Sequence, residues 1–412
     1  MREMKDSHNK WCGNIPVSWN MIPYKRLFKI YSGATPKSDE PENWDGDICW
    51  VTPADYKTED VYVSCGKRNL TQKGYDSCSA IIVPKNSIII SKRAPIGTVA
   101  ISKNDLATNQ GCLACVPNSN MDAKYGYYVT SAAKEELELR GSGTTFLEIS
   151  ANAFANMPIP VPSVNEQNAI VAFLDENCAK IADAITRHKQ IIEKLEEYKR
   201  SVITHAVTKG LNPDVEMKNS GVEWVGTIPE QWQTIKLKFV TTIRNEKGHF
   251  NPKTDKYVGL ENIEGYSGRY IETATQYTEA EYNICKKGDI VFNKLRPYLT
   301  KAMEIPFDCF CTNELIVFSS FEGNSKYLLY LLLSDSFIDN VNASTYGAKM
   351  PRANPDFVRN IEIPIPSKSE QNTIVLYLDN MCKKIDEAIT RQKAAIEKLE
   401  EYRKSIIYNA VT

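Results

Sequence analysis

The heptamer IEKLEEY occurs twice in this chain, beginning at Ile192 and again at Ile396. It is part of a longer match, in which residues 159–208 are similar to residues 363–412, 204 positions later. Agreement over this length excludes chance, so the chain is a tandem duplication. Whatever fold the first copy adopts, the second copy must be able to adopt as well.

A second repeat lies at a different offset. The segment from Glu3 to Trp19 shares nine residues with the segment from Glu216 to Trp232, 213 positions later. Because the two offsets differ, the region between the shared blocks is nine residues longer in the first copy. The duplication predicts five parts: an N-terminal shared segment 1–23, a first domain 24–156, a central shared region 157–236, a second domain 237–360 and a C-terminal shared region 361–412.

Composition is typical of a soluble protein with several domains. The chain has 412 residues, of which 42% are hydrophobic and 25% charged, and a net charge of -1. The start MREMKDSHNKWCG has no apolar run behind its charges, and no segment has the roughly 20 apolar residues of a membrane helix, so we expect a cytoplasmic protein. Eleven cysteines, scattered through hydrophobic runs, indicate reduced thiols in a core. With four histidines and no second cysteine pair at a suitable spacing, we expect no metal site.

The repeated blocks are predicted to be long helices. Each opens with Pro-Ser followed three residues after the serine by Glu, at residues 163–166 and 367–370, which is the pattern of a capping box. The first helix is expected over about 164–209, since Gly210 follows the last periodic residue. About 45 residues at 1.5 Å each form a rod of roughly 65 Å, longer than a globular core needs.

Both predicted helices carry the 4-3 apolar spacing of a coiled-coil seam. The seam positions are Leu174, Cys178, Ile181, Ile185, His188, Ile192, Leu195, Lys199, Val202 and Ala206 in the first, and Leu378, Cys382, Ile385, Ile389, Gln392, Ile396, Leu399, Arg403, Ile406 and Ala410 in the second. Two such stripes in one chain most simply bury each other. More than 100 residues lie between the helices, enough to bring the chain back for antiparallel pairing, so an internal pseudo-two-fold axis is expected.

Polar residues interrupt both seams at matching positions, His188 with Gln392 and Lys199 with Arg403. One interpretation is that they fix the register of the two helices or extend past the edge of the seam. The other is that they belong to a surface for a partner.

The regions between the shared blocks have diverged, but their landmarks keep the same order. SIIISKRAPIG from Ser87 resembles DIVFNKLRPYL from Asp289, and TNQ at Thr108 recurs as TNE at Thr312. The runs DICWVTP, AIIVP, DIVFNKL and LIVFSS predict strands, and KYLLYLLLSDSFIDNV predicts a helix. We therefore expect an α+β fold class, with two mixed, strand-rich domains separated by a pair of long antiparallel helices.

The order of its motifs resembles that of the specificity subunits of type I restriction-modification systems. The motifs are SGVEWVGTIPEQW at the centre, YSGATPKSDEPENWDGDICWVTPADY and ISKRAPIGTVAISKNDLATNQG in the first domain, KKGDIVFNKLRPYLTKA in the second, and PIPVPSVNEQ and IPIPSKSEQ before the helices. In that family, two target-recognition domains each bind half of a split DNA site. The helices separate these domains and dock two methyltransferase subunits, and a nuclease-translocase completes the restriction complex.

The resemblance implies a non-catalytic recognition subunit that binds double-stranded DNA. It also implies no cofactor in this chain, with S-adenosylmethionine, ATP and Mg expected on the partner subunits. A stand-alone enzyme is disfavoured because its motifs are broken: NPDF at Asn354 has Asp356 where an adenine methyltransferase motif has a second proline, so we interpret it as a loop. A coiled-coil scaffold whose two globular domains bind protein partners is the alternative. Charge does not exclude it, since residues 24–156 and 237–360 each carry 15 basic and 15 acidic side chains.

Clustered cations in predicted loops are the candidate DNA contacts, because such loops can place a cation on phosphate or an Arg against guanine. They are Lys92, Arg93, Lys294, Arg296, Lys349 and Arg352, and ordinary solvated cations are the alternative for each. The candidate docking positions are outward residues of the repeated heptamer, Glu193, Lys194, Glu197, Glu397, Lys398 and Glu401. No catalytic or metal-binding residue is predicted.

Overall fold

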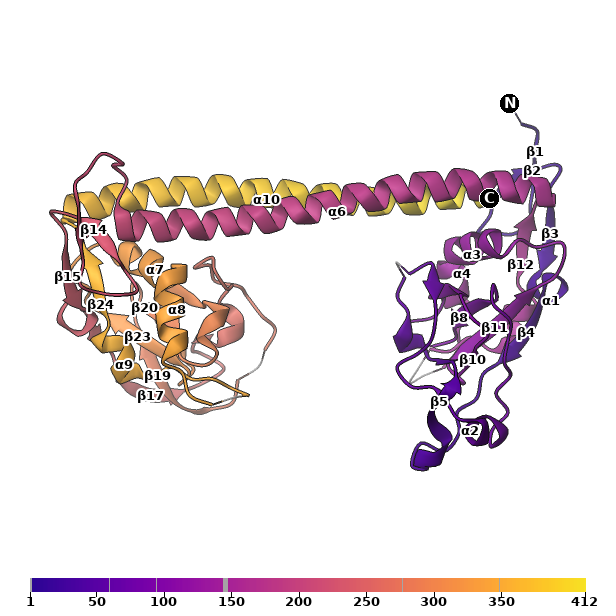
Figure 1. Ribbon diagram of the computed structural model, residues 1–412, viewed down its shortest axis with the longest axis horizontal. Helices are drawn as coiled ribbons and strands as arrows, with labels where there is room; N and C mark the ends of the chain where they lie inside the picture. The colour runs from indigo at the N-terminus through magenta and orange to yellow at the C-terminus, as the bar shows by residue number, and fades with distance from the viewer. Residues whose placement is uncertain (1, 59, 94, 144–146, 276, 348) are drawn as a thin grey trace. The chain divides into compact units, whose positions relative to one another are not determined.

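The computed structural model describes the chain except residues 1, 59, 94, 144–146, 276 and 348. The chain divides into two compact units. The first unit consists of Met1–Arg187 and Ala395–Thr412, and the second of His188–Ala394. Each unit therefore contains one variable domain and one part of each long helix (Figure 1).

The long helices are α6 (Val164–Lys209) and α10 (Lys368–Val411). The bounds of α6 agree with the helix expected from the sequence. Gly210 ends it with φ of 76°, a left-handed conformation that glycine adopts without strain.

Half of each predicted capping box is present. The hydroxyl of Ser163 accepts from the N–H of Glu166 at 3.4 Å, and Ser367 accepts from Glu370 at 3.3 Å. The carboxylate of Glu166, which a complete box would direct back to the backbone, instead pairs with Arg2. The shared N-terminal segment is thereby tied to the start of α6.

Within each unit the two long helices run antiparallel, as predicted. In the first unit Leu174, near the start of α6, shares a core with Val411 at the end of α10. In the second, Lys199 near the end of α6 contacts Asp386 in the first half of α10. All the predicted seam positions are buried or half-buried, which confirms the seam.

Five strands of the first unit form one sheet in the order β4-β11-β8-β9-β7, in which only β7 and β9 pair in parallel. Smaller pairs are β1 with β2, β3 with β12, and β6 with β10. The strands are β1 (Met4–Asp6), β2 (Asn14–Pro16), β3 (Asn20–Pro23), β4 (Phe28–Ser32), β5 (Trp44–Ile48), β6 (Trp50–Val51), β7 (Tyr62–Val63), β8 (Ile88–Ser91), β9 (Val99–Ser102), β10 (Ala107–Thr108), β11 (Cys112–Pro117) and β12 (Pro158–Val161).

The second unit repeats this plan with changes. Its main sheet has the order β16-β23-β20-β21, a second sheet has the order β17-β19-β22-β18, and β13 pairs with β14 and β15 with β24. The strands are β13 (Met217–Asn219), β14 (Thr227–Pro229), β15 (Gln233–Lys236), β16 (Thr242–Ile243), β17 (Lys247–Phe250), β18 (Tyr257–Val258), β19 (Ala280–Cys285), β20 (Ile290–Asn293), β21 (Ala302–Glu304), β22 (Cys309–Cys311), β23 (Leu315–Ser319) and β24 (Glu362–Ile365).

Short helices complete each unit, and α3, α4 and α5 of the first unit correspond in order to α7, α8 and α9 of the second. They are α1 (Tyr24–Leu27), α2 (Gln72–Asp76), α3 (Ala123–Ala132), α4 (Lys134–Leu139) and α5 (Ala151–Ala155) in the first unit, and α7 (Ser325–Leu333), α8 (Asp335–Ala343) and α9 (Pro355–Asn360) in the second. The 3-10 turns are η1 (Pro41–Asn43), η2 (Pro53–Asp55), η3 (Leu237–Phe239), η4 (Leu260–Asn262) and η5 (Pro297–Leu299). In each unit the main sheet and the helix that follows its last strand in sequence, α3 after β11 or α7 after β23, share one hydrophobic core with the long helices.

Three local predictions were wrong. AIIVP (80–84) forms no strand: Ile81 and Ile82 are exposed, and only Val83 makes an isolated bridge, because the run has no neighbouring strand to pair along its length. The helix predicted over 326–341 is broken at buried Ser334, whose backbone is extended and whose hydroxyl donates to Leu331 O at 2.6 Å. NPDF starts helix α9, because the side chain of Asn354 caps it.

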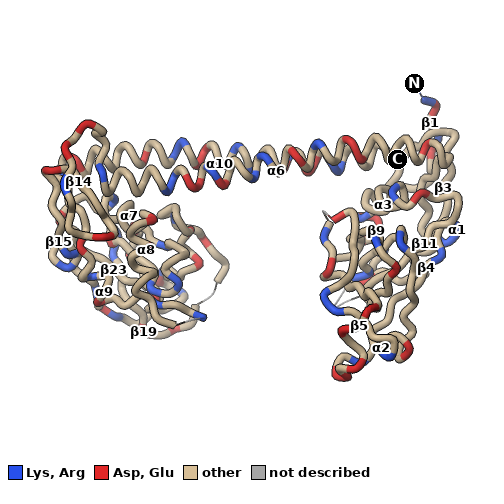
Figure 2. The backbone as a smooth tube through the Cα atoms, in the orientation of Figure 1, with Lys and Arg blue, Asp and Glu red and all other residues tan. Residues whose placement is uncertain are grey.

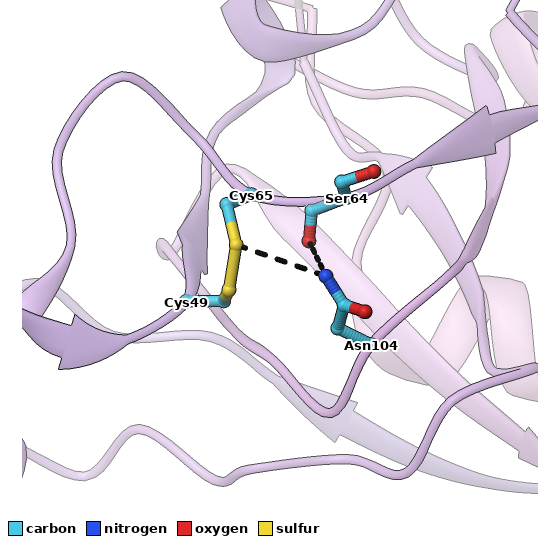
Figure 3. The surroundings of a disulfide bond; sticks show 4 residues. All are labelled: Cys49, Ser64, Cys65 and Asn104. Atoms are coloured by element: carbon cyan, nitrogen blue, oxygen red, sulfur yellow. Dashed lines mark hydrogen bonds between the residues drawn. A yellow bond between two sulfur atoms is a disulfide. The ribbon is translucent and has the colours of Figure 1, made fainter.

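The expectation that all cysteines are reduced was also wrong. Cys49 and Cys65 form a disulfide, and Figure 3 shows the side chain of Asn104 beside it. Their Cα atoms are 4.9 Å apart, within the range that a disulfide spans. The pair joins the segment between β5 and β6 to the segment after β7. The other nine cysteines are free.

Candidate functional site

The loop after β8 carries the first predicted cation pair. The backbone N–H of Lys92 donates to Gly111 O at 2.8 Å, and its carbonyl accepts from Ile149 N at 2.9 Å, so the loop is held between two neighbouring segments. The Lys92 side chain is only 13% exposed, and its ammonium lies 3.0 Å from a carboxylate oxygen of Glu148. Arg93 is half-buried. Lys92 must therefore leave an internal ion pair before it can contact a nucleic acid.

The remaining predicted cations gather in one place in the second unit. Two backbone hydrogen bonds join the loop after β20 to the segment before α9: Arg296 N donates to Pro351 O at 2.7 Å, and Ala353 N donates to Lys294 O at 2.9 Å. Lys349 is exposed and the other three cations are half-buried. The cations brought together are Lys294, Arg296, Lys349 and Arg352.

Arg352 is held by a carboxylate. Its Nη2 lies 2.9 Å and its Nε 3.2 Å from the two carboxylate oxygens of Glu314, the two-bond geometry in which Arg is oriented most firmly. The hydrogen bonds from Arg352 lower the pKa of Glu314 below its usual value, against the opposing effect of burial. The Arg352 side chain remains 42% exposed, so its unused N–H groups are accessible.

The loop after β20 has a constrained backbone. Arg296 has φ of 52° and Thr300 has φ of 47°, a region that non-glycine residues seldom adopt. These two residues flank η5. The buried amide of Asn293 donates to the carbonyl of Arg296 at 2.9 Å and so holds the loop. The loop leaves Tyr298 45% exposed.

Sequence reasoning missed several residues of this site. The carboxylates Glu148 and Glu314 orient the cations, yet both lie far from them in sequence. Exposed apolar side chains also stand beside the cations, namely Leu147, Tyr298, Leu299, Tyr346 and Met350. The TNE motif includes Glu314, but nothing in the sequence indicates that Arg352 is its ion-pair partner.

Charges of both signs are interspersed over both units and along α6 and α10, as Figure 2 shows. This agrees with the equal numbers of basic and acidic side chains in each variable domain. Any contact with a polyanion would therefore depend on local groups of cations such as those around Arg352.

Each variable domain is fastened to the long helices by the same contacts. Tyr128 donates to Asp175 at 2.8 Å in the first unit, and Tyr330 donates to Asp379 at 2.7 Å in the second. Lys124 and Lys326 pair with these same two aspartates. In each unit a buried glutamine, Gln167 or Gln371, accepts from the backbone N–H that precedes α3 or α7 and donates to the carbonyl of Pro162 or Pro366. The duplication has therefore preserved how the domain attaches to the helices.

A cavity lies beside this attachment in each unit, of about 960 Å³ in the first and about 650 Å³ in the second. Several lining residues correspond between the units: Tyr128, Cys178, Arg403 and Ile407 in the first match Tyr330, Cys382, Lys199 and Ile203 in the second. The cavities are equivalent features of the duplicated fold.

The polar interruptions of the seam have partners in the second unit. His188 Nδ1 lies within hydrogen-bond distance of Gln392, and Lys199 contacts both carboxylate oxygens of Asp386. These contacts support the interpretation that the polar residues fix the register. In the first unit Ala182 stands at the position that corresponds to Asp386, so the pair of Lys199 has no equivalent there for Arg403.

The six predicted docking residues on the helices are all exposed: Glu193, Lys194, Glu197, Glu397, Lys398 and Glu401. Large exposed side chains also lie at equivalent positions elsewhere along the two helices and at the end of each heptamer, which the sequence reasoning missed. Tyr198 and Tyr402 are 51% and 55% exposed, and Phe173 and Tyr377 are 52% and 39% exposed. Exposed aromatic residues beside mixed charges are typical of protein-protein interfaces.

Among the described residues, no group of three or more His, Cys, Asp or Glu lies close enough to hold a metal ion. None of the described helices combines the length and the apolar character that a membrane crossing requires.

Two related domains, each attached to the long helices by matching contacts, define a duplicated two-domain protein built on a helical scaffold. The model of the type I restriction modification DNA specificity domain matches residues 16–197 and 229–398. The two matches cover most of the chain. The chain therefore belongs to the family of type I restriction-modification specificity subunits.

Individual relatives agree with this assignment. The type I restriction enzyme MjaIX specificity subunit of Methanocaldococcus jannaschii is 29% identical over 380 residues, which are 86% of this chain and 84% of that protein. The MjaVIII specificity subunit of the same organism is 25% identical over 411 residues, covering 95% and 92%. A solved structure from work on complex assembly and conformational transition of the type I R-M system has a TM-score of 0.71 at 14% identity, covering 96% of this chain and 98% of that chain. At this identity the last comparison supports the fold.

Proposed function

We propose that each variable domain binds one half of a bipartite, asymmetric site in double-stranded DNA. One observation carries the proposal: the two domains share their contacts with the long helices but differ in the ion pairs around their predicted DNA contacts. The contacts that attach each domain to the helices are the same in both units, whereas the ion pairs beside the loops after β8 and β20 differ, Lys92 with Glu148 in the first and Arg352 with Glu314 in the second. A constant scaffold with divergent loops suits two readers of different base sequences.

The long helices would dock two methyltransferase subunits. The repeated heptamer offers the same exposed charges twice, and Tyr198 and Tyr402 add an equivalent exposed ring to each copy. Aromatic side chains provide much of the binding energy of protein interfaces when they become buried. A nuclease-translocase subunit would join the complex through these partners, as the family implies.

The chain itself is proposed to be non-catalytic and to hold no cofactor. S-adenosylmethionine, ATP and Mg would be bound by the partner subunits, and the complex would act in the cytoplasm. The purified chain should then neither methylate nor cleave DNA, and stoichiometric methyl transfer by the chain alone would contradict the proposal.

A gel-shift titration at two salt concentrations separates DNA binding from the alternative scaffold that binds protein through its domains. Neutralising phosphates releases counterions, so the affinity for DNA should fall steeply between about 50 and 200 mM salt. The titration should use the chain bound to its methyltransferase partner. An absence of DNA binding at low salt would favour the protein-binding scaffold.

A further inference from the structure

A short hairpin precedes α5 in the first unit and α9 in the second. In the first, Ser142 and Glu148 exchange two backbone hydrogen bonds of 3.0 Å. In the second, Tyr346 and Arg352 exchange two bonds of 3.3 and 3.0 Å. The bonded residues are six positions apart in both cases. We call residues 142–148 and 346–352 the tip hairpins; residues 144–146 and 348 lie outside the described residues and form no part of the site considered.

The two tip hairpins are anchored in the same way. The residue after each hairpin donates its N–H to the loop that follows the central strand: Ile149 N to Lys92 O, and Ala353 N to Lys294 O, both at 2.9 Å. Lys92 and Lys294 occupy the same place in the matching motifs. Positions 148 and 352 are therefore equivalent positions on equivalent backbones.

These equivalent positions carry opposite charges. Glu148 lies 3.0 Å from the ammonium of Lys92, and Arg352 lies 2.9 Å from the carboxylate of Glu314. The side chains of Glu148 and Arg352 are 39% and 42% exposed, so neither is committed to a core. Backbone hydrogen bonds that match at the described residues while the charge inverts are what a change of recognised base requires. Guanine presents two acceptors in the major groove, whereas cytosine presents an amino donor.

Arg352 and Glu148 both keep hydrogen-bonding atoms that their ion pairs do not use. A guanidinium has five N–H donors, and Arg352 uses Nε and Nη2 on Glu314. Its remaining donors are oriented by that carboxylate, because the guanidinium is planar and rigid. A carboxylate has two oxygens, and Glu148 contacts the ammonium of Lys92 through Oε1. Beside these groups Tyr346 is 63% exposed and Leu147 is 45% exposed, which suits contacts with sugars or thymine methyl groups.

We propose that positions 148 and 352 determine base specificity, with Arg352 donating to a guanine in one half-site and Glu148 accepting from a cytosine amino group in the other. This inference rests on the proposed function, in which each domain binds its own half-site. Glu314 and Lys92 are positioning residues that hold the two side chains toward the DNA.

The test maps methylated motifs in cells that express the full chain with its methyltransferase partner. For R352Q, discrimination at one base pair of one half-site should fall roughly 5- to 150-fold, while the other half-site and the gap are retained. For E148Q, a loss of similar size should occur at one base pair of the opposite half-site. The double variant E314Q/R352Q replaces the ion pair with neutral residues of similar shape, so it should show the same motif as R352Q if the effect is readout.

The control is K349Q, an exposed cation on the same tip hairpin that is expected to contact phosphate. It should weaken methylation at every site without changing the motif. Unchanged motifs in both R352Q and E148Q, or a uniform loss of methylation in either, would overturn the inference while the wild-type complex still methylates a bipartite site. If the wild-type complex methylates no bipartite site, the proposed function itself fails.

Discussion

Lys199 on α6 donates to both carboxylate oxygens of Asp386 on α10, at 2.8 and 3.0 Å. The lysine side chain is only 9% exposed and the aspartate 24%. A cation at a seam position is unfavourable unless an anion faces it, so this pair selects one antiparallel register.

The first prediction concerns this pair. Replacing Asp386 with Ala leaves a buried ammonium without its partner and should lower the free energy of unfolding by about 1 to 3 kcal/mol. The double variant K199M/D386L should recover most of the loss, because it removes both charges. Urea titrations of the single and double variants measure this, with K180A in the exposed pair Lys180–Glu176 as the control expected to change little. A double variant as unstable as D386A would show that the pair does not set the packing.

The second prediction concerns the effect of low pH on the ion pair of Arg352 with Glu314. The hydrogen bonds from Arg352 lower the pKa of Glu314 in the folded state below its usual value of 4.5. The stability that this pair contributes is therefore present above that usual value and lost as the pH falls through the lower folded pKa. The protection of the Tyr346 and Arg352 amides, measured relative to intrinsic exchange at each pH, should fall over this range. In E314Q the exchange should be faster throughout and lose this pH dependence; if E314Q keeps the wild-type profile, another group is responsible.

The third prediction concerns the helical surface. Exchanging charge at Glu193, Lys194 and Glu197, together with Tyr198→Ser, should weaken binding of one methyltransferase subunit more than the other, because the matching surface at 397–402 is untouched. Native mass measurement of the complex distinguishes species with one and two partners. Two partners still bound when both surfaces are altered would place docking elsewhere.

The fourth prediction concerns Arg93. Its replacement by Ala should cost roughly 1 to 3 kcal/mol of discrimination if the side chain contacts guanine, confined to one base pair of one half-site. Competition binding against single-base variants of the site measures this. A loss of equal size on all sequences would identify Arg93 as a phosphate contact.

The long helices were predictable because their information is local and repeated. One apolar period runs along residues 164–209, and Gly210 marks the end. The failures came where structure depends on distant residues. Ile81 and Ile82 suit a strand, but no neighbouring strand reaches them. The break at Ser334 separates α7 from α8 within a segment predicted as one helix, and there Asp335 N donates to Thr204 on α6.

Prediction of the candidate site was likewise limited by contacts between residues far apart in the sequence. Lys92, Arg93 and Arg352 were predicted as candidate contacts from clustering alone, whereas the residues that surround them could not be predicted. Glu148 and Glu314 hold two of these cations from 56 and 38 positions away, so no local pattern could pair them. The disulfide of Cys49 with Cys65 depends likewise on how two separate segments meet.

The most direct test of the account is an exchange of residues 24–156 for the matching segment of a relative with a different motif, followed by mapping of methylated adenines in cells. The account predicts that one half-site changes to that of the donor, while the other half-site and the gap between them stay the same. A motif in which both halves change together would contradict it, because the two domains would then not be independent readers.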